Sequence, residues 1–155
     1  PWTSWIEDDP PRWKGGGTRR SAPRRPRSGN VVATILVVVV DDDDELRGLL
    51  VQQLQRAGHH VLAAGNGNEA SQLLAHPDLG IELVLADIFM PEKGGMEIMM
   101  ACKTRSVPVL AMSGGDGRGR IDTLAAAQLL GAVRVLRKPF SDEELIAAVD
   151  AVLRG

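Results

Sequence analysis

The stretch ILVVVVDDDD, residues 35–44, decides the fold class of this 155-residue chain. Its six consecutive apolar residues are typical of a parallel β-strand that is buried on both faces, since such strands read as continuous Val, Ile and Leu. Four aspartates follow at once and put acidic side chains where that strand ends. The apolar run is far shorter than the roughly 20 residues needed to cross a bilayer, and no small-residue cleavage site follows it. We therefore predict a buried strand here and no membrane association.

The alternation of strand and helix continues through residues 31–155. The expected strands cover residues 34–40, 60–64, 83–87, 107–112 and 133–137. The expected helices cover residues 43–57, 68–74, 95–103, 121–130 and 142–153. Five such units predict an α/β domain with a five-stranded parallel sheet, helices on both faces and the flavodoxin-like strand order 2-1-3-4-5.

Side chains near the helix ends support these boundaries. Asp43 or Asp44 is expected to cap the first helix, and Ser141 with Glu144 forms a capping-box pattern before the last one. An Asn-Gly-Asn sequence, residues 66–68, is expected to cap the second helix. The first helix is expected to bury one apolar face: Leu46, Leu49, Leu50 and Leu54.

Composition divides the chain into two parts. Residues 1–30 are rich in Pro, Gly, Ser and Arg without an apolar period, which predicts a disordered extension before a domain over residues 31–155. The first part holds seven Lys or Arg and three Asp or Glu, and the second holds eleven and seventeen, giving net charges of +4 and −6. The acidic second part is not expected to bind nucleic acid. A single cysteine excludes an internal disulfide and fits a cytoplasmic protein.

Five side chains that could bind a ligand or take part in a reaction lie at the ends of expected strands: Asp41, Asp42, Asp87, Ser113 and Lys138. In a parallel α/β sheet, the carboxyl ends of the strands open into the crevice that binds ligands. Carboxylates there suit Mg²⁺, which takes oxygen ligands from one or two acidic residues and from phosphate groups. A metal ion, a lysine and a hydroxyl around one carboxylate would suit phosphoryl transfer to that carboxylate.

Each of these residues alone also has a plainer interpretation. The aspartates after the first strand could merely cap the following helix and complement its dipole. Asp87 could belong to an ordinary turn, and Ser113 is of a type common in turns and caps. Lys138 alone could be a solvated surface lysine. The ordered set, and not any single residue, therefore carries the functional argument.

Four motifs in this order resemble the receiver domain of bacterial two-component response regulators, of the single-domain, chemotaxis-regulator-like kind. They are the strand with its acidic run over residues 35–47, the loop DIFMPEKGGME over residues 87–97, the segment PVLAMSG over residues 108–114 and LRKPF over residues 136–140. The first is similar to the family's opening strand and acidic pair, and the second to its phosphoacceptor loop. The third and fourth are similar to its switch-hydroxyl strand and its Lys-Pro-Phe motif. The resemblance covers about residues 33–154.

This resemblance implies a role for each residue. Asp87 would accept a phosphoryl group from a phosphohistidine on a sensor histidine kinase or phosphotransfer protein, and Ser113 and Lys138 would hold phosphoryl oxygens. The Mg²⁺ ligands would be Asp41, Asp42, Asp87 and the backbone carbonyl of Phe89. The family resemblance thus implies a cytoplasmic phosphoacceptor regulatory domain, not an enzyme, that signals by docking to an unidentified downstream protein.

Two alternatives remain. Val135 stands where the family often has an aromatic switch residue, which leaves open a degenerate receiver that acts only as a protein-binding module. A haloacid-dehalogenase-like phosphatase also uses Asp, Mg²⁺ and Lys, but its Asp-x-Asp-x-Thr/Val signature fails here, because the fifth residue is Glu45 or Leu46. No output domain is expected, since none follows Gly155 and residues 1–30 are too short for one. That favours a stand-alone receiver or the receiver of a hybrid kinase.

Overall fold

A computed structural model describes residues 33–88, 90, 94–114, 128 and 131–155. The extension predicted for residues 1–30 lies outside these residues, and so does the helix predicted for residues 121–130, apart from Gln128. Within the described ranges, no helix is both long and apolar enough to cross a membrane.

The described residues form a parallel sheet of five strands in the order β2-β1-β3-β4-β5. The strands are β1 (Leu36–Val40), β2 (His60–Ala64), β3 (Leu83–Asp87), β4 (Val109–Gly114) and β5 (Arg134–Lys138). The three central strands are almost wholly buried, as expected from sequences made up mainly of Val, Leu and Ala. The predicted fold class and strand order are confirmed.

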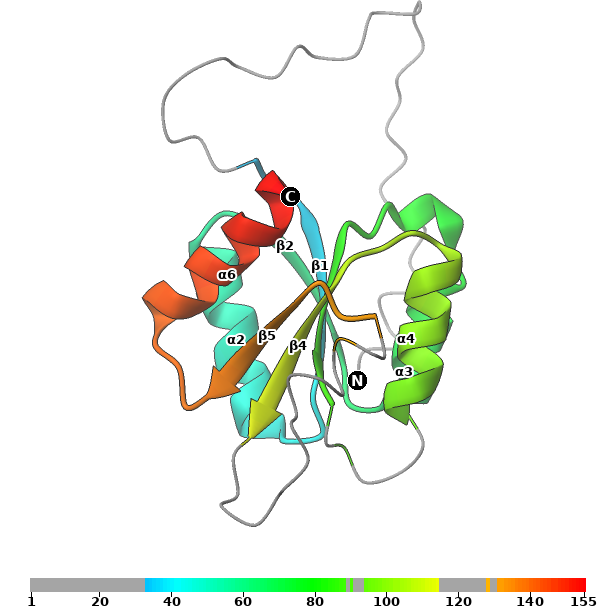
Figure 1. The fold of residues 1–155 in the computed structure, drawn as a ribbon, viewed down its shortest axis with the longest axis horizontal. Helices are drawn as coiled ribbons and strands as arrows, with labels where there is room; N and C mark the ends of the chain where they lie inside the picture. The colour runs from blue at the N-terminus through cyan, green and yellow to red at the C-terminus, as the bar shows by residue number, and fades with distance from the viewer. Residues whose placement is uncertain (1–32, 89, 91–93, 115–127, 129–130) are drawn as a thin grey trace, which may run out of the picture. The chain divides into compact units, whose positions relative to one another are not determined.

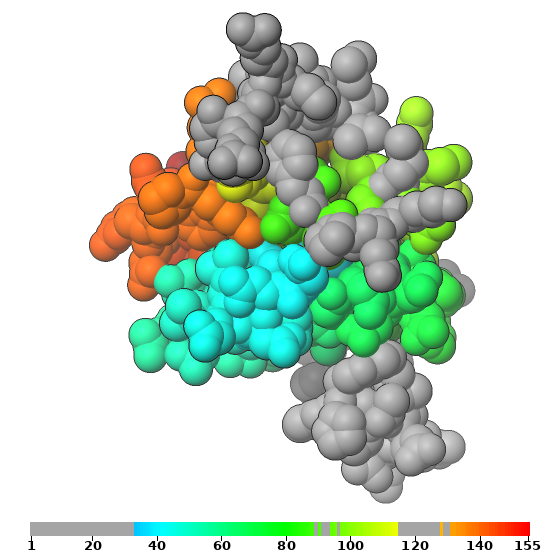
Figure 2. All heavy atoms as spheres, turned by 90° about the horizontal axis from the view of Figure 1, so that it is seen from below, coloured from blue at the N-terminus to red at the C-terminus, as the bar shows by residue number. Residues whose placement is uncertain are grey.

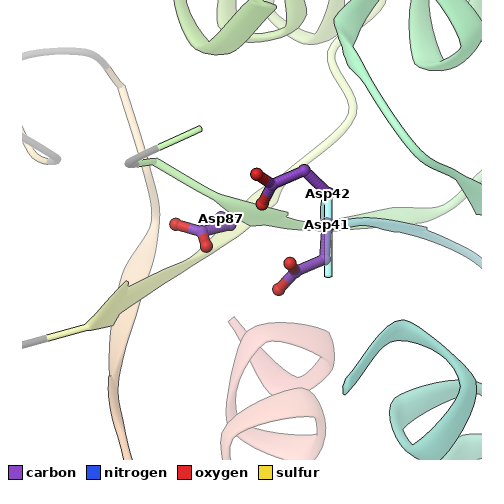
Figure 3. Close-up of side chains that lie close together, drawn as sticks. All are labelled: Asp41, Asp42 and Asp87. Carbon is purple, nitrogen blue, oxygen red and sulfur yellow. The ribbon is translucent and has the colours of Figure 1, made fainter. Parts of the chain in front are cut away.

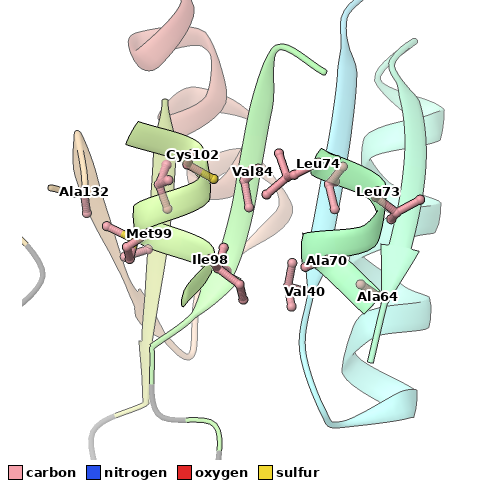
Figure 4. Close-up of a cluster of buried hydrophobic side chains, with 14 residues drawn as sticks. Val40, Ala64, Ala70, Leu73, Leu74, Val84, Ile98, Met99, Cys102 and Ala132 are labelled. Carbon is pink, nitrogen blue, oxygen red and sulfur yellow. The ribbon is translucent and has the colours of Figure 1, made fainter. Parts of the chain in front are cut away.

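Helices cover both faces of the sheet. Helices α2 (Asp44–Arg56) and α6 (Asp142–Arg154) lie on one face, and α3 (Gly67–Leu74) and α4 (Gly94–Thr104) lie on the other (Figure 1). Alternate residues of β1 supply the two cores, because successive side chains of a strand point to opposite faces. Val37 and Val39 pack with residues of α2 and α6, whereas Val38 and Val40 join the cluster beneath α3 and α4 (Figure 4). A 3₁₀ turn that was not predicted, η1 (Pro77–Leu79), follows α3.

The helix starts agree with the predicted caps. The side chain of Asp43 accepts hydrogen bonds from the backbone N–H groups of Glu45 and Leu46, at 3.0 and 3.1 Å. Asn66 caps α3, and Ser141 forms the predicted capping box with Glu144. The prediction that Leu49 joins the buried face of α2 is wrong.

Leu49 is 55% exposed, while Leu50 and Leu54 are buried. Residues four apart lie on the same side of a helix, so Leu46, Leu50 and Leu54 form one row toward the sheet. Leu49 falls to the side of that row and faces solvent.

Because the strands are parallel, their carboxyl ends gather at one end of the domain. Figure 2 views the domain from this end, with α2 in cyan and α6 in orange and red on one side and α3 and α4 in green on the other. The strand register places Asp87 beside Met112 and Gly114 beside Lys138. The ends of β3, β4 and β5 therefore present their polar residues to a common region.

His59 lies at the opposite end of the strands, just before β2. Its side chain is buried, and neither ring nitrogen has a hydrogen-bond partner among the described residues. Burial lowers the pKa of His59 below its ordinary value of 6.5, and the negative charge of Asp150 only partly opposes this shift. The folded protein therefore keeps this imidazole neutral at pH values at which the unfolded chain binds a proton.

We expect this difference to make the unfolding free energy depend on pH. As pH falls through about 6.5, His59 binds a proton in the unfolded chain but not in the folded one. The unfolding free energy therefore decreases until pH reaches the lower pKa of His59 in the folded state. Urea denaturation between pH 8 and pH 5 should show a smaller loss for His59→Gln than for the parent. The control His60→Gln removes an exposed imidazole ring, and its unfolding free energy should decrease between pH 8 and pH 5 by as much as that of the parent. Equal losses in the parent and His59→Gln would contradict this account.

Candidate functional site

The four aspartates after β1 occupy four different environments. Asp41 is completely buried, and its carboxylate Oδ1 accepts a hydrogen bond of 2.9 Å from the backbone N–H of Asp43. Asp42 is exposed, Asp43 caps α2, and Asp44 pairs with Arg47 on the helix surface. The capping interpretation thus holds for Asp43, while Asp41 and Asp42 remain available for another role.

Lys138 joins the ends of three strands. Its Nζ donates a hydrogen bond of 3.0 Å to Asp41 Oδ2 and one of 2.9 Å to Asp87 Oδ2. Asp87, at the end of β3, is 8% exposed. Two buried carboxylates from different strands therefore share one ammonium group. The Lys138–Pro139 peptide bond is cis.

Opposing effects act on the protonation of Lys138. Burial disfavours the charged ammonium and would lower its pKa, but the hydrogen bonds and charges of Asp87 and Asp41 outweigh burial, so that the pKa is raised. The group therefore stays charged at neutral pH. It supplies the positive charge without which the two neighbouring carboxylates would repel each other.

The carboxylates of Asp41, Asp42 and Asp87 each offer an oxygen, and these oxygens lie within 4.8 Å of one another. In Figure 3 the side chains of Asp41 and Asp42 extend from the end of β1 toward the side on which Asp87 lies. Three carboxylate oxygens clustered at the carboxyl ends of the strands form a donor set of the hard type that Mg²⁺ prefers. These residues therefore fit the Mg²⁺ site expected from the sequence.

Ser113 and Phe89 complete the predicted set. Ser113 is buried near the end of β4, one residue beyond Met112, the strand partner of Asp87. Along β4, Ser113 lies between Met112, which pairs with Asp87, and Gly114, which pairs with Lys138. Phe89 lies outside the described residues. The structure thus brings Asp41, Asp42, Asp87 and Lys138 together and places Ser113 on the adjoining strand end.

Sequence reasoning missed Arg47 as a part of this site. Its Nη1 donates a hydrogen bond of 2.7 Å to the backbone carbonyl of Asp41, while Nη2 pairs with Asp44. Asp44 and Arg47 are three residues apart, which is the spacing of an ion pair on a helix surface, so the sequence did indicate the contact of Arg47 with Asp44. The bond to a backbone carbonyl outside the helix has no corresponding sequence pattern.

The shared ammonium makes Lys138 important for the stability of the folded chain. We expect Lys138→Met to lower the unfolding free energy by about 2–3 kcal/mol without Mg²⁺, because it leaves two buried carboxylates without their counter-charge. Added Mg²⁺ should restore part of the loss by neutralising the same carboxylates. Urea denaturation with and without Mg²⁺ measures both effects.

The matched control is Lys103→Met, which removes an exposed lysine from the end of α4. Its unfolding free energy should stay within about 0.5 kcal/mol of that of the parent. A Lys138→Met protein as stable as this control would mean that the ammonium does not hold the carboxylates together.

Comparisons with known proteins agree with this arrangement. Residues 37–150 match the family described as the response regulator receiver domain. The transcriptional regulatory protein CpxR of Escherichia coli K12 is 38% identical over 111 residues, a match that covers 70% of this chain and 45% of CpxR. Because the chain spans less than half of that relative, the predicted lack of an output domain is not confirmed.

Solved structures give the same result. A response regulator receiver protein from Burkholderia phymatum superposes with a TM-score of 0.71 at 31% identity, covering 78% of this chain and 96% of that one. The chemotaxis response regulator CheY4 of Vibrio cholerae gives a TM-score of 0.66 at 26% identity, covering 77% and 99%. The predicted resemblance is confirmed: this chain belongs to the family of response regulator receiver domains of bacterial two-component systems.

Proposed function

We propose that this chain accepts a phosphoryl group on Asp87 in a Mg²⁺-dependent step of a two-component phosphorelay. The observation that carries the proposal is the position of Lys138 Nζ, within hydrogen-bond distance of two buried carboxylates that belong to a cluster of three. Such a cluster concentrates negative charge where a phosphoryl group and a divalent cation meet. The repulsion among the three carboxylates is offset only when cations are present.

The proposed reaction is a displacement at phosphorus. A carboxylate oxygen of Asp87 forms a bond to the phosphorus atom as the N–P bond of a phosphohistidine breaks, and the released electron pair stays on the imidazole, which takes up a proton. Asp41, Asp42, Asp87 and the Phe89 carbonyl would hold Mg²⁺, which would supply positive charge to offset the charge of these carboxylates and of the phosphoryl oxygens. The transition state of such transfers is loose, so the protein contributes mainly positioning and charge.

Lys138 has a specific part in this displacement. When the Asp87 carboxylate becomes an acyl phosphate, its own oxygens lose their negative charge, and an anionic phosphoryl oxygen can accept the hydrogen bond that Lys138 gave to Asp87. The second hydrogen bond, to Asp41, holds the ammonium in place during the exchange. The hydroxyl of Ser113, on the next strand end, would donate to another phosphoryl oxygen.

The partners follow from this chemistry. We propose a sensor histidine kinase or phosphotransfer protein as the donor, a downstream protein as the target and the cytoplasm as the location. The role is that of a regulatory phosphoacceptor in the domain over residues 31–155, with residues 1–30 as an extension. The relative CpxR is named a transcriptional regulator. DNA binding is nevertheless not proposed for the receiver portion, since residues 31–155 carry a net charge of −6.

The second candidate is a receiver that binds proteins without being phosphorylated. It is favoured by Val135, a partly buried residue of β5 that packs against the core beneath α3 and α4 where an aromatic switch residue is expected. Loss of phosphorylation does not follow from Val135, because that residue is not among the acidic, lysine and hydroxyl groups of the site. We therefore rank this candidate second.

Phosphorylation by acetyl phosphate, read by intact mass, tests the proposed function. The parent should gain one phosphate in the presence of Mg²⁺ and none in its absence, and Asp87→Asn should gain none, because the amide lacks the nucleophilic carboxylate. Asp78→Asn is the matched control, since it removes an exposed carboxylate in the turn η1. That variant should be modified like the parent.

Two results would contradict the proposal. A folded parent protein that gains no phosphate would favour the receiver that only binds proteins. A phosphate that persists in Asp87→Asn would assign the acceptor to another residue.

A further inference from the structure

Arg47 connects the acidic loop to helix α2. Its side chain is 21% exposed and reaches back from the first turns of the helix, and Nη1 donates a hydrogen bond of 2.7 Å to the Asp41 carbonyl oxygen. Nη2 of the same group pairs with Asp44, whose side chain is 86% exposed. An exposed pair of this kind contributes little by itself, about 0.3–0.5 kcal/mol. The bond to the Asp41 carbonyl is therefore the part that needs a functional explanation.

The hydrogen bond from Arg47 completes the environment of Asp41. The backbone N–H of Asp41 donates to the Ala64 carbonyl at 3.2 Å, and its two carboxylate oxygens accept from the Asp43 N–H and from Lys138. The Asp41 carbonyl accepts from Arg47. Each nitrogen and oxygen atom of this fully buried residue thus has a partner, and Arg47 is the one that lies on the next helix.

A neighbouring loop leaves room for the guanidinium. A Cβ atom at Gly65 would lie 3.4 Å from Arg47 Nη1 and 3.5 Å from Glu69 Oε2, so even a methyl group would touch both side chains. Glu69 Oε2 in turn accepts a hydrogen bond of 2.7 Å from the Gly65 N–H. Arg47 therefore lies between the Asp41 carbonyl and the turn after β2, close to both.

We propose that Arg47 is a positioning residue for the metal site. It holds the Asp41 carbonyl so that the carboxylates of Asp41 and Asp42 keep their places beside Asp87. This inference rests on the Mg²⁺ site of the proposed function and assigns to Arg47 no contact with the ion or with a phosphoryl group.

The charge of Arg47 and its positioning role would have opposite effects on Mg²⁺ affinity when the residue is replaced. Arg47 carries a positive charge close to the site, and its removal by electrostatics alone would strengthen the binding of a divalent cation. Loss of positioning would weaken that binding, by about 10- to 100-fold for partners that orient metal ligands. The sign of the change in Mg²⁺ affinity therefore separates the two effects.

The test is calorimetric titration of the full chain with Mg²⁺ alone. Arg47→Gln and Arg47→Lys should both raise the dissociation constant at least tenfold, because neither side chain has the planar fork that serves Asp41 and Asp44 together. Arg47→Lys keeps the charge, so weakened binding there cannot be an effect of net charge. The control, Arg56→Gln, removes an exposed charge from the last turn of the same helix and should bind Mg²⁺ within about twofold of the parent.

A second readout does not depend on metal binding. Hydrogen exchange of the Asp43 backbone amide, which donates to Asp41 Oδ1, should be faster in both Arg47 variants than in Arg56→Gln, in protein free of Mg²⁺. Circular dichroism establishes that each variant is folded at the temperature of measurement, and Arg47→Lys is the milder change.

The outcomes separate this inference from the proposed function. A parent that binds Mg²⁺ together with Arg47→Gln of equal or higher affinity would overturn the positioning role and leave the proposed function intact. A lower melting temperature with unchanged Mg²⁺ affinity would likewise overturn it and make Arg47 merely structural. A parent that binds no Mg²⁺ would overturn both.

Discussion

The shared ammonium of Lys138 is the interaction on which the rest of the site depends. Asp41 and Asp87 are almost completely buried from solvent, and two like charges are stable in such a place only beside a cation. Lys138 is the last residue of the edge strand β5, and its side chain extends past the end of β4 to reach Asp87 on β3 and Asp41 after β1. Its strand partner on β4 is Gly114, and a Cβ atom there would lie 3.9 Å from Lys138 Cδ. The strand order and the length of the lysine side chain together let one ammonium group reach both strand ends, and a Cβ atom at Gly114 would make only ordinary contact with that side chain.

Much of the fold could be predicted because central parallel strands must be apolar throughout. Strands β2 and β3 have the predicted bounds, but β4 and β5 end later than expected, at Gly114 and Lys138 instead of residues 112 and 137. Apolarity marks where a strand is buried, whereas backbone hydrogen bonds continue through polar residues such as Ser113 and Arg137. Asp87, Ser113 and Lys138 therefore belong to the strands themselves, whereas Asp41 and Asp42 follow the end of β1.

The sequence predicted that Asp41, Asp42, Asp87 and Lys138 converge, but it did not predict the contact of Arg47 or the different surroundings of the four aspartates. Parallel topology brings the ends of β1, β3 and β5 together, so Asp87, Lys138 and the acidic run were expected to converge. Which of four consecutive aspartates turns inward depends on the path of the chain between β1 and α2. Here Asp43 N–H bonds to Asp41, Asp43 caps the helix, and Arg47 reaches back to the Asp41 carbonyl. Of these contacts, the cap has a sequence signature, whereas the hydrogen bonds of the Asp43 N–H and the Asp41 carbonyl involve backbone groups and leave no pattern in the sequence.

The account predicts that the cluster holds a phosphoryl group on Asp87, with cations on both sides of it. The most direct test is ¹⁹F NMR of the chain with beryllium fluoride, whose complex with a carboxylate oxygen has the shape and charge of a phosphoryl group. With Mg²⁺ present, one beryllofluoride per protein should give resonances distinct from free fluoride species, and these should vanish without Mg²⁺ and in Asp87→Ala. A folded protein that binds Mg²⁺ but gives no bound ¹⁹F signal would contradict the account.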